Sequence, residues 1–184
     1  MIIAIGSDYY FIESFYDDGG NVIESRITKY DQVSPGLVEF RNAKGYITRG
    51  AIVEDTLYYT AYNEDTNDYT IYSIDRKDFN ATPKAERTLE WDEIYSQNGE
   101  LYTVEGGYLV SGDKSIKGGS ENYFVGDDLL VEYVIDSQAS LTAVLIDTAT
   151  GEELLTAVDI IDFTVSGPKL TFYCHGSIQE YDRA

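Results

Sequence analysis

Two reactive side chains stand next to each other in the sequence, Cys174 and His175, the only cysteine and the only histidine of the chain. A cysteine nucleophile activated by a histidine requires the two side chains to face each other. These residues lie at the end of a predicted strand, where successive side chains point to opposite faces. We therefore interpret both as structural residues. A single histidine with a single cysteine also disfavours a transition-metal site.

Oxygen-rich and acidic residues suggest two further kinds of chemistry. Residues 63–68, Asn-Glu-Asp-Thr-Asn-Asp, carry side chains of the type that binds Ca²⁺, but they lack the spacing and central glycine of an EF-hand loop. Acidic neighbours such as Glu54-Asp55 and Asp92-Glu93 do not provide the two carboxyl groups that a glycosidase holds across a cleft. We therefore predict a solvated turn at 63–68, and no catalytic residue, metal or cofactor.

The elements that position these residues are predicted to be β-hairpins. Five segments consist of two strand-like runs joined by a short polar turn, and they cover 8–31, 56–75, 100–113, 129–147 and 169–182. In the fourth segment apolar residues alternate along 129–135, as on a strand with one buried face. Residues 136–140 are polar and short enough for a hairpin turn, and 141–146 are apolar enough for a strand covered on both faces.

These hairpins recur at a nearly regular spacing. The second strand of each closes on an aspartate, and the five aspartates are Asp31, Asp75, Asp113, Asp147 and Asp182, spaced 34 to 44 residues apart. Short-strand units repeated at such a period are typical of propeller blades. We expect most of these carboxylates to accept hydrogen bonds from backbone N–H groups of their own turns.

Two stretches resemble β-propeller repeats of a loose kind. They are Leu-Tyr-Tyr at 57–59 with Ile-Tyr-Ser-Ile-Asp at 71–75, and Val-Leu-Ile-Asp at 144–147 with Thr-Gly-Glu at 150–152. The chain has a single Trp-Asp dipeptide, at 91–92, which does not recur as it does in WD repeats, and it has no kelch double-glycine pattern. The resemblance implies a small five-bladed β-propeller, and it implies architecture only, because propellers host enzymes, lectins and scaffolds alike.

Two regions leave the fold class open between this all-β propeller, a β-sandwich and an α+β fold. Residues 83–95 alternate as a strand does, but they also suit a short helix that begins after Pro83. Residues 151–162 have an apolar spacing that suits a helix, whereas the repeat predicts two strands. We favour strands in both, within a single all-β domain spanning 1–184. The Gly- and Ser-rich stretch 111–122 is predicted to be a mobile loop.

The composition limits the function. A net charge of −20 and a pI near 4.1 disfavour direct binding to nucleic acid or to an anionic membrane, both of which need clustered Lys and Arg. The single cysteine fits a reducing compartment, and the first residues lack the basic start of a signal peptide. We therefore expect a cytoplasmic protein. The 17 tyrosines and 7 phenylalanines suggest packed sheet surfaces.

The candidate site is a set of acidic residues in predicted turns. They are Glu54, Asp55, Glu64, Asp65, Asp68, Asp127 and Asp128. In a propeller the acids at 54–55 and 127–128 would emerge on one face and those at 64–68 on the opposite face. Their charge is free to attract a basic partner.

Our hypothesis is a non-enzymatic binding protein that blocks a basic surface of a partner, such as the substrate channel of a nucleic-acid-handling enzyme. Inhibitors, immunity proteins and anti-defence proteins share this charge and size. The first alternative is a sugar-binding propeller, because aromatic platforms stack on sugars. The second is a structural or assembly module whose acidity only maintains solubility.

Overall fold

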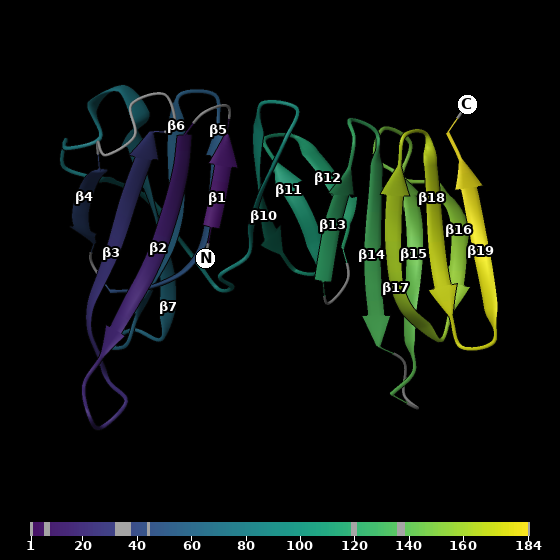
Figure 1. Ribbon diagram of the computed structural model, residues 1–184, viewed down its shortest axis with the longest axis horizontal. Coiled ribbons are helices and arrows are strands. Elements are labelled where there is room, and N and C mark those ends of the chain that lie inside the picture. Colours follow the sequence, from purple (N-terminus) through teal and green to yellow (C-terminus); the bar gives the residue numbers. More distant parts are fainter. Residues whose placement is uncertain are drawn as a thin grey trace. The chain divides into compact units, whose positions relative to one another are not determined.

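The computed structural model describes residues 2–5, 8–31, 38–43, 45–118, 121–135 and 139–183. These residues form five antiparallel sheets (Figure 1). In each sheet the neighbouring strands are also neighbours in the sequence, and the described pairings are antiparallel. This up-and-down order is that of a propeller blade, so we call the sheets blades 1 to 5.

The strand bounds of the first three blades are as follows. Blade 1 contains β1 (Ile2–Ile5), β2 (Asp8–Tyr16), β3 (Val22–Asp31) and β4 (Val38–Ala43). Blade 2 contains β5 (Tyr46–Val53), β6 (Thr56–Asn63), β7 (Asp68–Asp75) and β8 (Lys84–Leu89). Blade 3 contains β9 (Ile94–Gln97), β10 (Glu100–Glu105), β11 (Tyr108–Ser111) and β12 (Lys114–Lys117).

The last two blades complete the sheet structure. Blade 4 contains β13 (Glu121–Val125), β14 (Leu129–Ile135), β15 (Leu141–Asp147) and β16 (Glu153–Val158). Blade 5 has three strands, β17 (Ile160–Ser166), β18 (Lys169–Cys174) and β19 (Ser177–Asp182). The chain divides into two compact units, Met1–Glu105 and Gly106–Ala184, with the boundary after β10. The expectation of a single domain spanning 1–184 stays a prediction.

The predicted hairpins are confirmed, and each supplies the second and third strands of one blade. The aspartates Asp31, Asp75, Asp147 and Asp182 end the third strands β3, β7, β15 and β19, and Asp113 follows β11. The predicted local role of the carboxylate holds at two of them. Asp75 Oδ1 accepts from Lys77 N at 2.8 Å. Asp147 Oδ1 accepts from the N–H groups of Ala149 and Thr150 at 2.9 and 2.8 Å, and these bonds, that of Thr150 first, lower the pKa of Asp147.

The favoured prediction of strands within 83–95 and 151–162 is confirmed, because β8 pairs with β7 and β16 with β15, so that their backbone groups are used in the sheets. The α+β alternative is therefore wrong, and so is the sandwich, since the strands form five sheets in sequence rather than two. The stretch 111–122 is not a loop throughout, because β12 and the start of β13 lie in it. Within the described residues the only helical element is the short η1 (Arg76–Asp78).

Each unit has its own buried core. In Met1–Glu105, one side of blade 2 packs Leu57, Tyr59 and Ala61 against Tyr10 and Ile27 of blade 1. The other side of blade 2 packs on β9 and β10 of the same unit in a cluster that contains Ala51, Ile71, Leu89 and Ile94. In Gly106–Ala184, blades 4 and 5 share a core that includes Val131, Leu145, Leu170 and Phe172. Among the described residues no helix is long and apolar enough to span a membrane.

Candidate functional site

A row of tyrosines crosses one end of blade 2. Tyr46 of β5 pairs with Tyr62 of β6, and Tyr62 pairs with Tyr69 of β7. Residues directly opposite each other in adjacent strands project to the same face of a sheet, so the three rings lie on one face. The ring centroids of Tyr62 and Tyr69 are 5.2 Å apart. Tyr16 of blade 1 lies edge-on to Tyr46 at 6.3 Å, and a hydrogen bond with Tyr46 raises the pKa of Tyr16.

The segment after β8 lies across the same face. Thr60, two residues before Tyr62 on β6 and fully buried, donates its hydroxyl proton to the backbone oxygen of Asp92 at 3.0 Å. This bond holds the backbone beside Trp91 against the sheet. The indole of Trp91 stays half-exposed at 53%. An exposed tryptophan next to three tyrosines on a fixed strand face is a preformed aromatic surface.

These side chains line a cavity of about 520 Å³, a volume within the range of small-ligand sites. Its lining residues are Tyr46, Thr48, Tyr62, Asn67, Tyr69, Glu90 and Trp91. One of them is acidic and none is basic. A second cavity of about 440 Å³ adjoins it, lined in part by Tyr46, Tyr62 and Glu64 together with Val22 to Ser25 of β3.

The electrostatic surroundings of the row are acidic. Burial raises the pKa of Tyr69, and the charge of Asp92 adds to this effect. Arg49 partly compensates Asp92, with 3.9 Å between Nε and Oδ2. Within the described part of the chain no Lys or Arg stacks on the ring of Tyr46, Tyr62, Tyr69 or Trp91. The aromatic surface is therefore not occupied by a cation of the described chain.

The turn between β6 and β7 brings three of the predicted acidic residues to this end of the blade. Asn63 accepts from Asp65 N at 3.1 Å, and Asn67 has a positive φ of 54° and accepts from the Tyr62 hydroxyl at 2.7 Å. Asparagine tolerates this conformation and closes turns through its side chain. Glu64 and Asp65 are exposed and Asp68 is half-buried. No described Lys or Arg lies within ion-pair distance of these three carboxylates.

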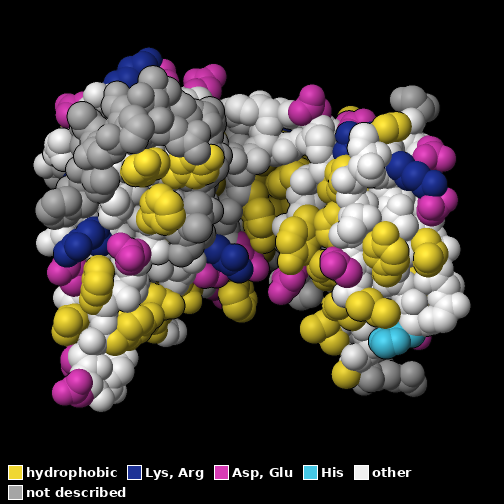
Figure 2. Space-filling model, in the orientation of Figure 1, with side chains coloured by type: hydrophobic (Ala, Val, Ile, Leu, Met, Phe, Trp, Pro, Cys, Tyr) yellow, Lys and Arg dark blue, Asp and Glu magenta, His cyan; other side chains and the backbone are white. Residues whose placement is uncertain are grey.

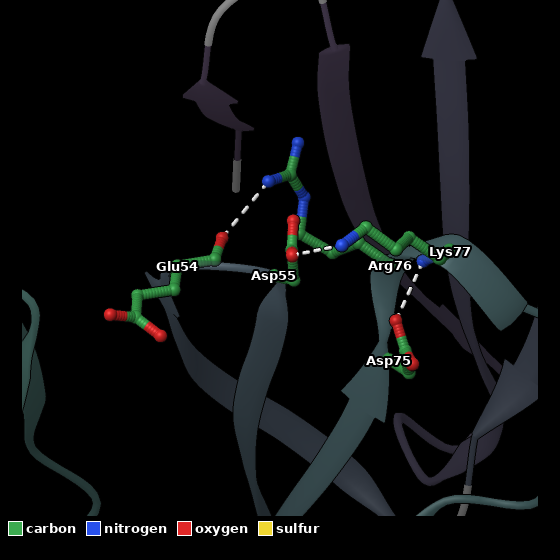
Figure 3. Close-up of polar contacts among 5 residues, drawn as sticks. All are labelled: Glu54, Asp55, Asp75, Arg76 and Lys77. Atoms are coloured by element: carbon green, nitrogen blue, oxygen red, sulfur yellow. Dashed lines mark hydrogen bonds and ion pairs between the residues drawn. The ribbon is translucent and has the colours of Figure 1, made fainter.

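Glu54 and Asp55 lie at the other end of β6, in the β5–β6 turn, as the propeller interpretation predicts. Figure 3 shows that two cations of η1 lie beside this turn. Lys77 forms an ion pair with Asp55, and Arg76 Nη1 donates to the Glu54 backbone oxygen at 3.0 Å. The hydrogen bond from Lys77 lowers the pKa of Asp55. The Glu54 carboxylate points away from both cations (Figure 3). Of this pair, only Glu54 has a carboxylate that no described cation compensates.

Asp127 and Asp128 belong to the other unit, in the turn between β13 and β14. Both are exposed, and the Asp128 backbone oxygen accepts from Thr148 N at 2.8 Å. On the face seen in Figure 2, acidic side chains are distributed over both units and lie among exposed hydrophobic side chains rather than in one patch. Within the unit Met1–Glu105, the structure places Glu64, Asp65 and Asp68 in the turn at one end of β6, and Glu54 and Asp55 in the turn at its other end.

The burial of Cys174 and the exposure of His175 agree with the prediction that they do not form a catalytic pair. Cys174 lies in the core of blades 4 and 5, whereas His175 is exposed, so the two side chains diverge as expected from adjacent positions. Glu132 of β14 is buried at 2% exposure, its Oε2 has no hydrogen-bond partner in the described residues, and burial raises its pKa. Within the same residues no three His, Cys, Asp or Glu side chains gather as metal ligands do.

Sequence reasoning missed the tyrosine row and Trp91 as a site. The signal was present in the hairpin 56–75, because Tyr62 and Tyr69 flank the turn 63–68 symmetrically and must pair if the hairpin forms. Nothing in the sequence showed that Tyr46 would be opposite Tyr62. The β5–β6 pairing contains a bulge between Ile47 and Arg49, which shifts the register by one residue.

The topology defines an all-β protein built of consecutive propeller-type blades. Neither a protein-family model nor a curated protein sequence matches the chain. Solved structures with a similar architecture include the β-propeller domain of the Trilobed protease from Pyrococcus furiosus, with 9% identity over 99% of this chain and 56% of that one, at a TM-score of 0.42.

Two further solved structures are similar at the same level. The acylaminoacyl peptidase of Pyrococcus horikoshii is 12% identical over 95% of this chain and 31% of that one, with a TM-score of 0.41. A segment of HIRA is 12% identical over 91% of this chain and 57% of that one, with a TM-score of 0.41. The chain thus spans from about a third to somewhat more than half of the length of these three structures.

Proposed function

We propose that this protein is a non-enzymatic, acidic binding protein that occupies a basic surface of a partner protein. The partner class that fits best is a nucleic-acid-handling enzyme, whose substrate channel is lined with Lys and Arg. Bound there, the protein would exclude the polyanionic substrate by steric and electrostatic blockade. In this proposal it acts in a reducing, cytoplasmic compartment and needs no cofactor.

One observation carries the proposal: three carboxylates that have no ion-pair partner among the described residues stand beside an exposed aromatic surface at one end of blade 2. Protein interfaces are enriched in Tyr and Trp, while uncompensated charge accelerates the encounter with a partner of opposite sign. The turn that presents Glu64, Asp65 and Asp68 is fixed by Asn63 and Asn67. Little ordering entropy is then lost when a partner binds, which favours affinity.

The test is affinity capture from source lysate at low salt, followed by elution along a salt gradient and identification of the eluted proteins. We expect a basic nuclease, polymerase or related enzyme, and loss of its activity when the purified protein is added. The triple variant E64Q/D65N/D68N should elute at clearly lower salt. A matched control, E13Q/D113N/E152Q, removes the same charge from exposed positions elsewhere and should retain the partner.

The outcome that contradicts the proposal is equally specific. If no basic protein is captured, or if the two triple variants release it at the same salt concentration, the acidic end of blade 2 is not the binding surface. Single charge-reversal variants of Glu54, Asp127 and Asp128, tested in the same salt-gradient elution, show whether these residues also contribute to partner binding. Asp55 should contribute least, because Lys77 already compensates it.

A second function is favoured by the aromatic surface itself. Tyr62, Tyr69 and Trp91 could stack on a sugar ring, and Glu90, Asn67 and Thr48 supply hydrogen-bonding groups in the same cavity. Stacking and neutral hydrogen bonds are little affected by salt, whereas binding through surface charges is screened. Oligosaccharide binding that persists at high salt would therefore favour a carbohydrate-binding protein over the acidic inhibitor.

A further inference from the structure

The aromatic cavity of blade 2 has the chemistry of a cation-binding site. A cation placed over the face of Trp or Tyr is attracted by the negative face of the ring. The cavity offers the ring of Trp91, the tilted pair of Tyr62 and Tyr69, and the carboxylate of Glu90, and no basic residue is among the described residues that line it. An aromatic wall with one carboxylate on a protein of net charge −20 complements a positively charged ligand.

The same unit shows which cation suits its aromatic rings. Arg26 lies over the Phe15 ring at 5.0 Å, Arg76 over Tyr10 at 5.8 Å and Arg41 over Phe79 at 6.0 Å. These three rings are already paired with guanidinium groups of the chain. The cavity residues have no such partner among the described residues, although two of them, Trp91 at 53% and Tyr46 at 38%, are among the more exposed aromatic groups of the unit.

The polar groups of the cavity favour guanidinium over ammonium. Guanidinium is planar, stacks on aromatic faces and donates in a fixed fork to a carboxylate, whereas ammonium is a compact and strongly hydrated charge. The Tyr62 hydroxyl donates its proton to Asn67, so its oxygen lone pairs remain to accept a hydrogen bond. Glu90, the Tyr62 oxygen and Thr48 are then acceptors around a stacked cation.

We infer that this cavity binds the side chain of an arginine that a basic partner presents. The inference rests on the proposed function and specifies it: Glu64, Asp65 and Asp68 attract a basic surface, and Trp91, Tyr62, Tyr69 and Glu90 select one arginine in it. Specificity then resides in the cavity, and the acidic turn mainly increases the association rate.

The chain carries its own reporter for this site, because Trp91 is its only tryptophan. The probe is a short acetylated and amidated peptide of alternating Gly and Arg, titrated into the full chain while Trp91 emission and the heat of binding are recorded. Two matched peptides replace Arg with Lys or with citrulline, a neutral isostere. We expect the Arg peptide to change Trp91 emission, the Lys peptide to bind several-fold more weakly, and the citrulline peptide at least tenfold more weakly.

Variants separate the cavity from the general acidity. Glu90→Gln should weaken the Arg peptide about tenfold, the size of effect expected for one charge-assisted hydrogen bond. Glu152→Gln, which removes one exposed charge in the other unit, should change affinity less than twofold. Trp91→Phe, read by the heat of binding, should retain part of the affinity, because a phenylalanine ring still binds cations, though more weakly than indole.

The results distinguish failure of this inference from failure of the proposed function. If Arg and Lys peptides bind equally, in a salt-sensitive manner, with Trp91 emission and the Glu90→Gln variant unaffected, the acidic surface binds basic chains but the cavity is not the site. Binding of citrulline and Arg peptides with equal affinity overturns the inference as well, and so does a Trp91 response to oligosaccharides alone. If neither cationic peptide binds at low salt, both the inference and the proposed function fail.

Discussion

The hydroxyl of Thr60 should stabilise blade 2 and also hold Trp91 in place, and Thr60→Val tests both roles. The Thr60 side chain is fully buried and forms two hydrogen bonds, one to the Asp92 backbone oxygen and one with Thr48 Oγ1, each at 3.0 Å. Thr60 has one hydroxyl proton and gives it to Asp92, so Thr48 must donate the second bond. Valine keeps the β-branched shape and leaves no cavity, so the change isolates these polar contacts.

The expected magnitude follows from those two bonds. Each contributes about 1 kcal/mol net, so the free energy of unfolding of the unit Met1–Glu105 should fall by about 2 kcal/mol. With a urea slope of about 2 kcal/mol per M, the unfolding midpoint should move down by about 1 M at an unchanged slope. Trp91 emission follows this transition, because it is the only tryptophan and lies in this unit.

A second measurement addresses the position of Trp91 in the native state. Acrylamide should quench Trp91 more strongly in Thr60→Val, because the Asp92 backbone loses its attachment to β6. Thr48→Val is the matched control: it removes only the bond that Thr48 donates, so it should cost about 1 kcal/mol or less and leave quenching unchanged. The hydroxyl has neither role if the free energy of unfolding of Thr60→Val is within about 0.5 kcal/mol of that of the parent, or if acrylamide quenches Trp91 equally in both variants.

Three further predictions concern the other unit and the binding reaction. Leu145→Ala should destabilise the core of blades 4 and 5 by about 2 to 5 kcal/mol, measured by urea unfolding followed by circular dichroism, because Leu145 is fully buried there. Burial raises the pKa of Glu132 above its ordinary 4.5, so the folded state keeps this proton to higher pH than the unfolded state and loses stability as pH rises between the two values. Glu132→Gln should remove that loss, so that its advantage over the parent grows from pH 4.5 upward in urea titrations, while the exposed Glu152→Gln should show no such trend. For the captured partner, the logarithm of the association rate constant should fall steeply with ionic strength while the dissociation rate constant changes little, and stopped-flow mixing at several salt concentrations measures both.

The hairpins could be predicted because local signals agreed with the final pairing. Residues 129–135 alternate, and the turn after β15 is closed by the Asp147 carboxylate, a role that its sequence context indicates. The same holds for Asp75. Residues 83–95 were ambiguous because the segment by itself suits both the periodicity of a strand and that of a helix. Only the pairing of β8 with β7 makes it a strand.

The site was predictable only in part. The acidic residues can be found from a short stretch of sequence, but the cations that form ion pairs with them can lie far away in the sequence. Asp55 and Lys77 are separated by the whole hairpin of β6 and β7, yet they meet where β5 turns into β6 and β7 ends. Among the described residues, no Lys or Arg forms an ion pair with the acids of the turn 63–68. Register has the same non-local character: a bulge in the β5–β6 pairing places Tyr46 opposite Tyr62, and no property of the segment 46–53 alone would indicate that.

The sequential order of strands within every blade has a consequence for how the chain acquires its structure. Because each strand's hydrogen-bonded neighbours are adjacent in sequence, a blade can form from a contiguous stretch of chain without waiting for a distant segment. Topologies with short sequence separation between paired residues fold faster than those with remote pairings, and their exposed strand edges persist for less time. During synthesis, blade 2 can pair all four of its strands as soon as residue 89 has left the ribosome. The surface proposed for binding is complete once Glu90, Trp91 and Asp92 have followed, while the second unit is still being made.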